Sequence, residues 1–341
     1  MVFKQALEQA LAGNDLSHAE MLSIMQQVMA GELTPAQIAG LLIALRVKGE
    51  SVDEISAAAS VMRELSTKVI INNKAHLIDT CGTGGDGIQT FNVSTCAAFV
   101  AAAAGAKVAK HGGRSVSSTC GSADVLEALG INVNLSPTQV ANCVETIGIG
   151  FMFAPNHHSA MKHAAPVRRE LGVRTLFNLL GPLTNPAGAK RQLMGVFSKD
   201  LTLKLAKVLQ NLGAEHVMVV NGADGMDEIS LTGDTFVAEL KDGKISEYTL
   251  NPAQFGFAKH DLNSIRVENS QASKAMILDV LQAKTITHQS SAARDIVLMN
   301  AGGAIYVAGL VDSKQAGCEL AAQVIDSGQA LAKLEALKAY Q

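Results

Sequence analysis

Residues 76–113 read HLIDTCGTGGDGIQTFNVSTCAAFVAAAAGAKVAKHGG. A short apolar run at 76–79 passes through a glycine-rich segment into a helical stretch at 93–104, and a second apolar run follows at 107–110. A strand, a helix and a strand in close succession are typical of a mostly parallel sheet with helices on both faces. Because ligands of such sheets collect at the carboxyl ends of the strands, the loops that follow the strands are where a site is expected.

The same alternation continues towards the carboxyl terminus. Further runs of strand length and further helical stretches alternate at 121–129, 150–154, 157–171, 192–197, 200–212 and 216–220. The dipeptide Asp242-Gly243 lies between FVAEL and ISEYTL, which predicts a β-hairpin. The last seventy residues again read as helical.

Residues 1–70 read as a separate unit of four short helices. Capping boxes at 17–20 and 51–54, and an N-cap followed by proline at 34–35, give three helix starts. The predicted fold class is therefore α/β: a small N-terminal helical domain, 1–70, and a larger α/β domain, 71–341, whose mostly parallel central sheet is flanked by helices. Four short helices cannot bury all of their apolar faces, which predicts dimerisation through the helical domain.

The composition excludes several classes of protein. The net charge is −3 and the basic residues are dispersed, so no nucleic-acid footprint is visible. The five cysteines form no C-x-x-C pair, which favours reduced thiols over disulfides or a zinc site. The longest apolar run, AAFVAAAAG, falls well short of the roughly 20 residues of a membrane span, and no signal-peptide core is present. These observations predict a cytoplasmic protein with no membrane partner.

The glycine-rich loop at 79–87, DTCGTGGDG, runs from a strand into a helix that begins near Asn92. Its glycines free the backbone to turn and to present N–H groups to an anion, and the helix start adds unpaired donors and a favourable dipole. A glycine-rich turn with a good N-cap is the simpler alternative. The loop also matches the dinucleotide fingerprint G-x-G-x-x-G, but the next strand ends in Lys110-His111 rather than in the carboxylate that this site requires.

The next loop, KHGGRSVSST at 110–119, is a second candidate anion site. It combines two cations, two glycines and several hydroxyls, although a solvated polar loop would have a similar composition. Two such loops on adjacent strands indicate a ligand with two separated phosphate groups. A sugar that carries a 5-phosphate and a 1-pyrophosphate has this character.

The third candidate is the acidic pair Asp227-Glu228, in the loop NGADGMDE after the apolar run 216–220. Adjacent carboxylates at a strand end suit Mg²⁺, which takes one or two acidic ligands together with water and phosphate oxygens. An exposed acidic pair is common on any protein. Opposite two phosphate loops, however, the charge balance calls for a cation.

The fourth candidate is FAPNHHSAMKHAAPVRRELGVRTLFNLLGPLTNP, residues 153–186. The adjacent His157 and His158 should point apart on a helix and have no ligand partner at zinc-binding spacing. Arg168 and Arg169 are better candidates, because a guanidinium binds a carboxylate with two parallel hydrogen bonds; a solvated helix face is the alternative. Pro166 is expected to kink the helix predicted at 157–171.

Taken together, GTGGDG with NVST, KHGGRSVSS, HHSAM with VRRELGVRTLFNLLGPLTNP, and the DE pair resemble anthranilate phosphoribosyltransferase. Order and spacing agree over nearly the whole chain. Single motifs are shared with pyrimidine nucleoside phosphorylases of the same fold, whereas FNLLGPLTNP after two adjacent histidines is more particular to the anthranilate enzymes. The resemblance implies transfer of the phosphoribosyl group of phosphoribosyl pyrophosphate to the amine of anthranilate, a step of tryptophan biosynthesis, by a Mg²⁺-dependent homodimer.

The resemblance also implies a role for individual positions. Lys110, Asp227 and Glu228 would be catalytic, and Ser94, Asp227 and Glu228 would bind metal. The anthranilate site would comprise Gly82, His111, Gly113, Pro155, His158 and Arg168. The phosphoribosyl pyrophosphate site would comprise Gly82, Gly85, Asp86, Thr90, Asn92, Val93, Ser94, Thr95, Lys110, His111, Gly112, Gly113, Arg114, Ser115, Val116, Ser117, Ser118 and Ser122.

The chain departs from the family pattern at Gly113, where the loop usually reads KHGN and the Asn contacts anthranilate. The anthranilate acceptor is therefore less firmly indicated than the phosphoribosyl donor. Two alternatives stay open at this point: a pyrimidine nucleoside phosphorylase, and a non-catalytic relative that binds nucleic acid on the same fold. The net charge of −3 and the intact acidic pair argue against the second.

Overall fold

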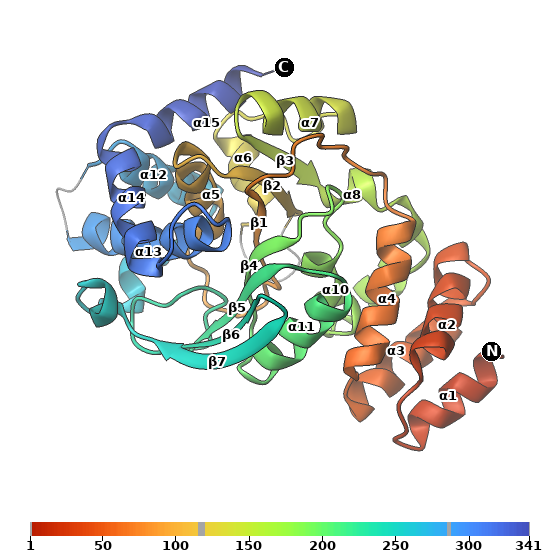
Figure 1. Cartoon of the computed structure of the whole chain (residues 1–341). Helices are drawn as coiled ribbons and strands as arrows, with labels where there is room; N and C mark the ends of the chain where they lie inside the picture. Colours follow the sequence, from red (N-terminus) through yellow and green to blue (C-terminus); the bar gives the residue numbers. More distant parts are fainter. Residues whose placement is uncertain (1, 115–119, 285–287, 341) are drawn as a thin grey trace.

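The computed structural model describes residues 2–114, 120–284 and 288–340. Its first part is a unit of four helices, and its second is a seven-stranded sheet covered by helices on both faces (Figure 1). The predicted fold class is confirmed. Within the described residues, no helix combines the length and the apolar character needed to cross a membrane.

The four N-terminal helices begin where the sequence predicts. They are α1 (Phe3–Leu11), α2 (His18–Ala30), α3 (Pro35–Lys48) and α4 (Val52–Glu64). The side chains of Ser17, Thr34 and Ser51 each accept a hydrogen bond from the backbone N–H three residues on, and the residue at that position bonds back to the cap. Each reciprocal pair satisfies donors that would otherwise be unpaired at a helix start.

The sheet has the order β3-β2-β1-β4-β5-β6-β7. The parallel strands are β1 (Leu77–Gly82), β2 (Lys107–Gly112), β3 (Ile149–Phe153), β4 (Arg191–Gly195) and β5 (His216–Gly222). Two antiparallel strands, β6 (Thr235–Lys241) and β7 (Lys244–Leu250), extend one edge. The predicted hairpin is confirmed, and both of its turn residues, Asp242 (φ 51°) and Gly243 (φ 74°), take the left-handed conformation.

The remaining helices cover the two faces of the sheet. They are α5 (Val93–Ala103), α6 (Ser122–Ala128), α7 (Pro137–Thr146), α8 (Ala154–His157), α9 (Ala165–Leu171), α10 (Phe177–Leu183), α11 (Asp200–Asn211), α12 (Ser270–Leu281), α13 (His288–Val307), α14 (Lys314–Asp326) and α15 (Gln329–Ala339). Three short 3-10 turns, η1 (Ser159–His163), η2 (Pro252–Phe255) and η3 (Leu262–Ile265), complete the set among the described residues. Helix α5 is buried along nearly its whole length between the sheet and α13 and α15, which explains its continuous apolar sequence.

One prediction about this region was wrong. Residues 157–171 do not form a single kinked helix, because the chain is divided into the end of α8, the turn η1 and helix α9. Pro166 lies in the first turn of α9, where its missing N–H would be unpaired in any case. The proline therefore starts a helix instead of bending one.

The helical unit shares a hydrophobic core with one face of the sheet. Buried residues of α2, α3 and α4 form one continuous cluster with α10, α11 and the facing side chains of β4 and β5. Two polar contacts cross the same boundary: Arg63 donates to the carbonyl of Leu183 at 2.6 Å, and Lys204 donates to the carbonyl of Glu50 at 2.8 Å. The segment 154–183 is thereby placed between the helical unit and the sheet. The proposed domain boundary after residue 70 stays a prediction.

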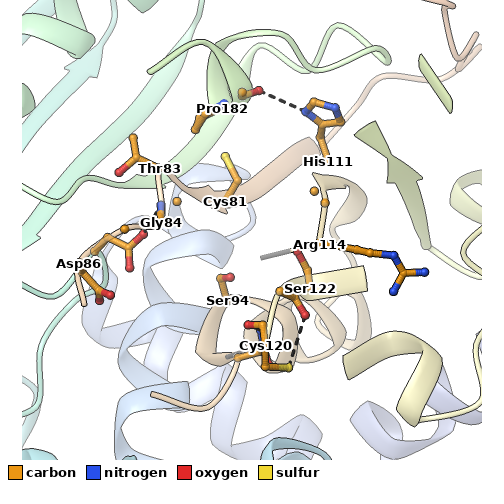
Figure 2. A pocket seen from close by; sticks show the side chains of 18 of the residues that line it. Cys81, Thr83, Gly84, Asp86, Ser94, His111, Arg114, Cys120, Ser122 and Pro182 are labelled. Atoms are coloured by element: carbon orange, nitrogen blue, oxygen red, sulfur yellow. Dashed lines mark hydrogen bonds between the residues drawn. The ribbon is translucent and has the colours of Figure 1, made fainter. Parts of the chain in front are cut away.

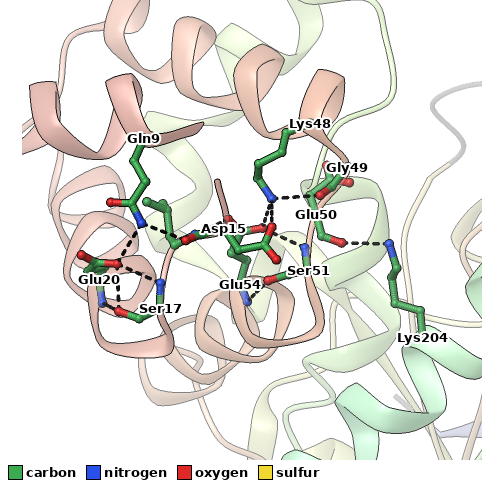
Figure 3. A network of polar contacts seen from close by, with 11 residues as sticks. Gln9, Asp15, Ser17, Glu20, Lys48, Gly49, Glu50, Ser51, Glu54 and Lys204 are labelled. Carbon is green, nitrogen blue, oxygen red and sulfur yellow. Dashed lines mark hydrogen bonds and ion pairs between the residues drawn. The ribbon is translucent and has the colours of Figure 1, made fainter. Parts of the chain in front are cut away.

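Glu54 links the loops of the helical unit from inside (Figure 3). The residue is fully buried; Oε1 accepts the N–H of Leu16 at 2.8 Å, and Oε2 accepts the N–H of Ser51 at 2.8 Å. Oε2 also pairs with Lys48 Nζ at 2.9 Å, and the Lys48 side chain is only 4% exposed. Buried charges of this kind are tolerated only with full pairing. Glu54 therefore fixes the loop before α2 to the end of α3 and to the loop before α4.

Glu54→Ala should lower the free energy of unfolding by about 3–5 kcal/mol, because it removes the buried partner of Lys48, which among the described residues keeps only Asp15 and the carbonyl of Gly49. It also leaves the N–H groups of Leu16 and Ser51 without their acceptor. Thermal and urea unfolding followed by circular dichroism would measure this. Glu20→Ala is the matched control, since Glu20 holds the same capping-box position in α2 but is solvent-accessible. A loss of stability in Glu54→Ala no greater than in the control would contradict the buried-pair argument.

Candidate active site

A cavity of about 380 Å³ lies at the carboxyl ends of the parallel strands (Figure 2). All four loops expected to carry a site contribute to it, together with α9 and α10. Its lining residues are Cys81, Gly82, Thr83, Gly84, Gly85, Asp86, Gln89, Thr90, Phe91, Asn92, Val93, Ser94, Lys110, His111, Gly112, Gly113, Arg114, Cys120, Gly121, Ser122, Ala154, Arg168, Phe177, Asn178, Gly181, Pro182, Asp227 and Glu228. Segments far apart in the sequence therefore meet at one place.

The glycine-rich loop leads into the start of α5, and part of its backbone is in the left-handed conformation. Gly84, Gly85 and Gly87 have φ values of 63°, 77° and 75°, which residues with a side chain rarely adopt. Asn92 is the N-cap of α5, but its side chain does not cap the helix. It accepts a hydrogen bond from Ser273 Oγ at 2.7 Å and donates one to the carbonyl of Cys120 at 3.2 Å. The start of α5 is thus held by residues distant in sequence.

The acidic pair lies against this loop. Asp227 Oδ2 accepts the N–H of Gly84 at 2.8 Å, and Glu228 Oε1 accepts the N–H of Ser94 at 3.1 Å. Burial, and then the charge of Asp86, raise the pKa of Asp227 to about 7. Burial and the charge of Asp227 raise the pKa of Glu228 well above its usual value. The carboxylates are therefore crowded and short of positive charge.

Two glycines make this close approach possible. Gly82 and Gly195 are partners across β1 and β4. A Cβ on Gly195 would lie 1.5 Å from the backbone oxygen of Asp227, and a Cβ on Gly82 would lie 2.3 Å from Asp227 Oδ2. A side chain at Gly195 would push the backbone of the acidic loop away from the strand ends, and one at Gly82 would displace the Asp227 carboxylate.

Lys110 supplies positive charge from below the cavity. Its side chain is buried, donates to the carbonyl of Thr80, and lies 3.2 Å from Ser94 Oγ. Burial lowers the pKa of Lys110, whereas the charge of the buried Asp79 opposes this effect most strongly. Asp79 is itself held by the N–H of His111 at 3.1 Å and by Asn185 Nδ2 at 2.8 Å.

Two histidines, His111 and His158, form a hydrogen-bonded pair at the cavity. His111 Nδ1 lies 3.2 Å from the carbonyl of Gly181, and only a protonated nitrogen can bond to a carbonyl. Its Nε2 must then accept a hydrogen bond from Nε2–H of His158 at 3.2 Å. Burial lowers the pKa of His111 to about 3 and that of His158 to about 4. His157, which points apart from His158, bonds to the carbonyl of Thr67 at 2.9 Å. The paired rings are uncharged at neutral pH.

Arg168 of α9 is a further cation that lines the cavity. It is half-buried on α9, and its guanidinium carbon lies 5.5 Å from the centre of the Phe177 ring. Asn178, Gly181 and Pro182 of α10 also line the cavity, and the carbonyl of Gly181 contacts His111. The neighbouring Arg169 is exposed. The arrangement places one charged fork beside aromatic and apolar surface.

Arg114 is paired outside the cavity. Its guanidinium bonds to Asp124 at 2.9 Å and to both carboxylate oxygens of Glu127 at 2.7 and 2.8 Å. Figure 2 shows the side chain directed away from Ser94 and Asp86. Arg114 therefore lines the cavity without presenting its charge to it in this structure.

Most of the predicted site residues line the cavity, but three do not. Thr95 is buried within α5, and Pro155 is exposed on α8. His158 reaches the cavity only through its contact with His111. Ser115, Val116, Ser117 and Ser118 lie outside the described residues. Thr95 and Pro155 are therefore not among the lining residues, and their assignment to the ligand sites stays a prediction.

Several lining residues were not singled out from the sequence. They are Cys81, Thr83, Gln89, Phe91, Cys120, Gly121, Ala154, Phe177, Asn178, Gly181 and Pro182. Four of them belong to the segment FNLLGP, which was noted as a family motif but given no role. That motif was the available signal; the others reach the cavity only through tertiary packing.

The fold and the cavity define a two-domain glycosyltransferase. Residues 4–66 match the helical bundle domain and residues 74–331 the a/b domain of a glycosyl transferase family. The chain is 62% identical over 339 residues to anthranilate phosphoribosyltransferase from Methylobacillus flagellatus, covering 99% of this chain and 98% of the relative. It is 57% identical over 332 residues to the enzyme from Chromobacterium violaceum, covering 97% and 96%. The chain belongs to the anthranilate phosphoribosyltransferase family.

Solved structures agree with this assignment. Anthranilate phosphoribosyltransferase from Thermus thermophilus superimposes with a TM-score of 0.91 at 42% identity, over 98% of both chains. The Saccharomyces cerevisiae enzyme in complex with PRPP and Mg superimposes with a TM-score of 0.89 at 27% identity, over 98% of this chain and 96% of that one. The nucleoside phosphorylase and nucleic-acid-binding alternatives are not favoured.

Proposed function

We propose that the cavity is where the phosphoribosyl group of phosphoribosyl pyrophosphate passes to the amine of anthranilate, giving N-(5-phosphoribosyl)anthranilate and pyrophosphate. The reaction is inferred from the family to which the chain belongs, and its location is inferred from one structural observation. Two half-buried carboxylates, Asp227 and Glu228, line the cavity and accept backbone N–H groups of the glycine-rich loop and of the start of α5. A site that combines crowded acids with anion donors fits a metal ion and a phosphate ligand together.

The acidic pair fits Mg²⁺ by the chemistry of its donors. Within the described residues, no group of three or more His, Cys, Asp or Glu side chains could hold a metal ion alone. Mg²⁺ is typically held by one or two carboxylates together with substrate phosphates, so a pair is sufficient when the donor is bound. Asp227, Glu228 and the hydroxyl of Ser94 would hold it, and bound Mg²⁺ would supply positive charge near the leaving pyrophosphate.

The protein's own groups have a different task in the reaction. Displacement at the anomeric carbon requires that the growing charge of the pyrophosphate be neutralised and that the amine be held in line with the breaking bond. Lys110, below the start of α5, and the N–H groups of the loop serve the first requirement. The amine loses its proton readily after it has bonded to carbon, so a strong base is not needed. The neutral His111 and His158 are consistent with this.

The acceptor is assigned to the wall formed by α9 and α10. A carboxylate needs a charge-assisted partner, and Arg168 is the cation that lines this wall. The face of Phe177 and the ring of Pro182 offer apolar surface for an aromatic acid. Gly113, directly after β2, also lines the cavity.

Asp227→Asn/Glu228→Gln should reduce turnover by orders of magnitude, because the leaving group would lose its compensating charge. Product fluorescence would measure turnover with and without a chelator. The variant should also be at least as stable as the wild type in metal-free buffer, since two crowded, half-buried acids are removed. Undiminished activity of the variant with metal chelated would refute the magnesium role.

Arg168→Ala should raise the KM for anthranilate by about 10- to 100-fold, the loss expected for a hydrogen bond to a charged group, while the KM for the donor changes little. Arg169→Ala, which removes an exposed arginine from the same helix, is the control.

Gly113→Asn should lower the KM for anthranilate about fivefold by adding one neutral hydrogen bond.

The structure permits this second substitution. Gly113 has no left-handed backbone, and among the described residues a Cβ there would meet only Ala154 Cβ, at 4.0 Å. An unchanged or higher KM for anthranilate in Gly113→Asn would mean that this position does not contact the acceptor. Equal effects of Arg168→Ala on both substrates would give Arg168 a structural role.

We also propose a homodimer through the helical unit. Large apolar side chains stay exposed on or beside these helices, namely Val2 (65%), Leu11 (68%), Val47 (82%), Leu65 (47%) and Ile70 (69%). Light scattering at micromolar concentration should give twice the chain mass of 35.6 kDa. A mass of one chain under these conditions would contradict the proposal.

A further inference from the structure

Arg174 lies in the linker between α9 and α10, within the motif VRRELGVRTLFN. Its Nη2 donates to the carbonyl of Gly85 at 2.9 Å, across from the helical side of the cavity to the glycine-rich loop. The guanidinium carbon also lies 4.2 Å from the centre of the Phe197 ring. Arg174 itself is not among the lining residues, so it touches the loop from behind.

Both partners of this contact are anchored. The carbonyl of Arg174 accepts a hydrogen bond from Arg46 of α3. The N–H of Phe197 donates to Thr83 Oγ1 at 3.2 Å, and the N–H of Thr83 donates to the carbonyl of Gly195 at 2.9 Å. The guanidinium is therefore held between a fixed backbone and a fixed ring, and such preorganisation lets it bind one carbonyl in one direction.

Because the peptide bond is planar, the contact between Arg174 and the carbonyl of Gly85 also fixes the direction of the next N–H group, that of Asp86. In a trans peptide the C=O and N–H groups point in opposite directions. When the carbonyl of Gly85 faces Arg174, the N–H of Asp86 must face away from it, towards the cavity. In the described part of the chain, the N–H groups of Gly85 and Asp86 donate to no other group. They are donors without a partner beside a cavity.

Arg174 restricts a rotation of the backbone that the glycines of the loop would otherwise allow. Gly84 and Gly85 both lie at positive φ, where glycine alone moves at little cost, so the peptide between Gly85 and Asp86 could rotate. A rotated peptide would present its carbonyl to a phosphate and repel it. On the other side, Asp227 accepts the N–H of Gly84. The loop is thus held at the carbonyl of Gly85 by Arg174 and at the N–H of Gly84 by Asp227.

We propose that Arg174 is a positioning residue for the phosphoribosyl donor: by binding the carbonyl of Gly85 it directs the N–H of Asp86 towards the phosphates. The inference rests on the donor site proposed above. Arg174 acts through Gly85 and does not touch the substrate. Because the same segment carries Arg168 and Phe177, the acceptor wall and the donor loop share one support.

The test is donor binding and steady-state kinetics of Arg174→Ala. Donor affinity is measured by calorimetry with Mg²⁺ and without anthranilate, so that it does not depend on turnover. We expect the donor Kd and KM to rise about tenfold, as for loss of a charge-assisted hydrogen bond, with kcat and the KM for anthranilate changed much less. Arg174→Lys, which keeps a donor but not the stacking, should recover part of the loss. Arg169→Ala is the matched control.

The dependence of donor binding on ionic strength distinguishes an indirect role of Arg174, through Gly85, from a direct contact between its charge and the phosphates. If Arg174 touched the phosphates, its contribution would be screened by salt, and the ratio of mutant to wild-type Kd would fall as salt rises. Positioning through a carbonyl predicts a ratio that is nearly independent of salt. Phe197→Leu, which removes the ring but keeps Arg174, should give a smaller donor defect of the same kind.

Three outcomes would overturn the proposal: an unchanged donor Kd, equal losses for donor and anthranilate, or a strongly salt-dependent ratio. Should Arg174→Ala fail to fold, as judged by its melting curve, Arg174→Lys and Phe197→Leu carry the same test. Retained activity of the Asp227/Glu228 variant without metal would instead count against the donor site. The two failures are therefore distinguishable.

Discussion

The carboxylates of Asp86, Asp227 and Glu228 are held close together in the wall of the cavity, where burial, and then the charge of Asp86, raise the pKa of Asp227 to about 7. Like charges in a buried site repel, so the fold must supply the energy to assemble them. It does so by close backbone packing, since Gly195 lies directly against the backbone of Asp227. The register of β1 and β4 places Gly82 beside Gly195 and thereby fixes the acids against the phosphate loop.

Stability for this arrangement comes from the two hydrophobic clusters on either side of the sheet. One cluster surrounds α5 and α13, and the other joins the helical unit to α11. Functional sites commonly hold unfavourable charges that the surrounding core keeps in place. Here the rigid parts are the strand ends, and the segment 154–183 spans the gap between the helical unit and the cavity. The helical unit thereby contributes to the acceptor wall as well as to the core.

Much of this could be predicted from local sequence. The capping boxes at 17–20 and 51–54 and the hairpin turn at 242–243 depend on neighbours in sequence, and all three are confirmed. The strand ends and the four site-bearing loops followed from alternation of apolar runs. Contacts between distant segments could not be predicted in this way. Neither the approach of Arg174 to the loop nor the outward pairing of Arg114 has any local sequence signal.

The division of charge within the cavity explains why no catalytic dyad is visible. His111 and His158 use their facing nitrogens on each other, and burial lowers the pKa of His111 to about 3, so neither supplies a cation at neutral pH. Fixed positive charge comes instead from Lys110 below the donor loop and from Arg168 on the acceptor wall. A reaction limited by departure of an anion needs such placed charge more than it needs a base. On the proposed assignment, the site binds anions through both Lys110 and Arg168, and the geometry of the glycine-rich loop decides how well the donor is held.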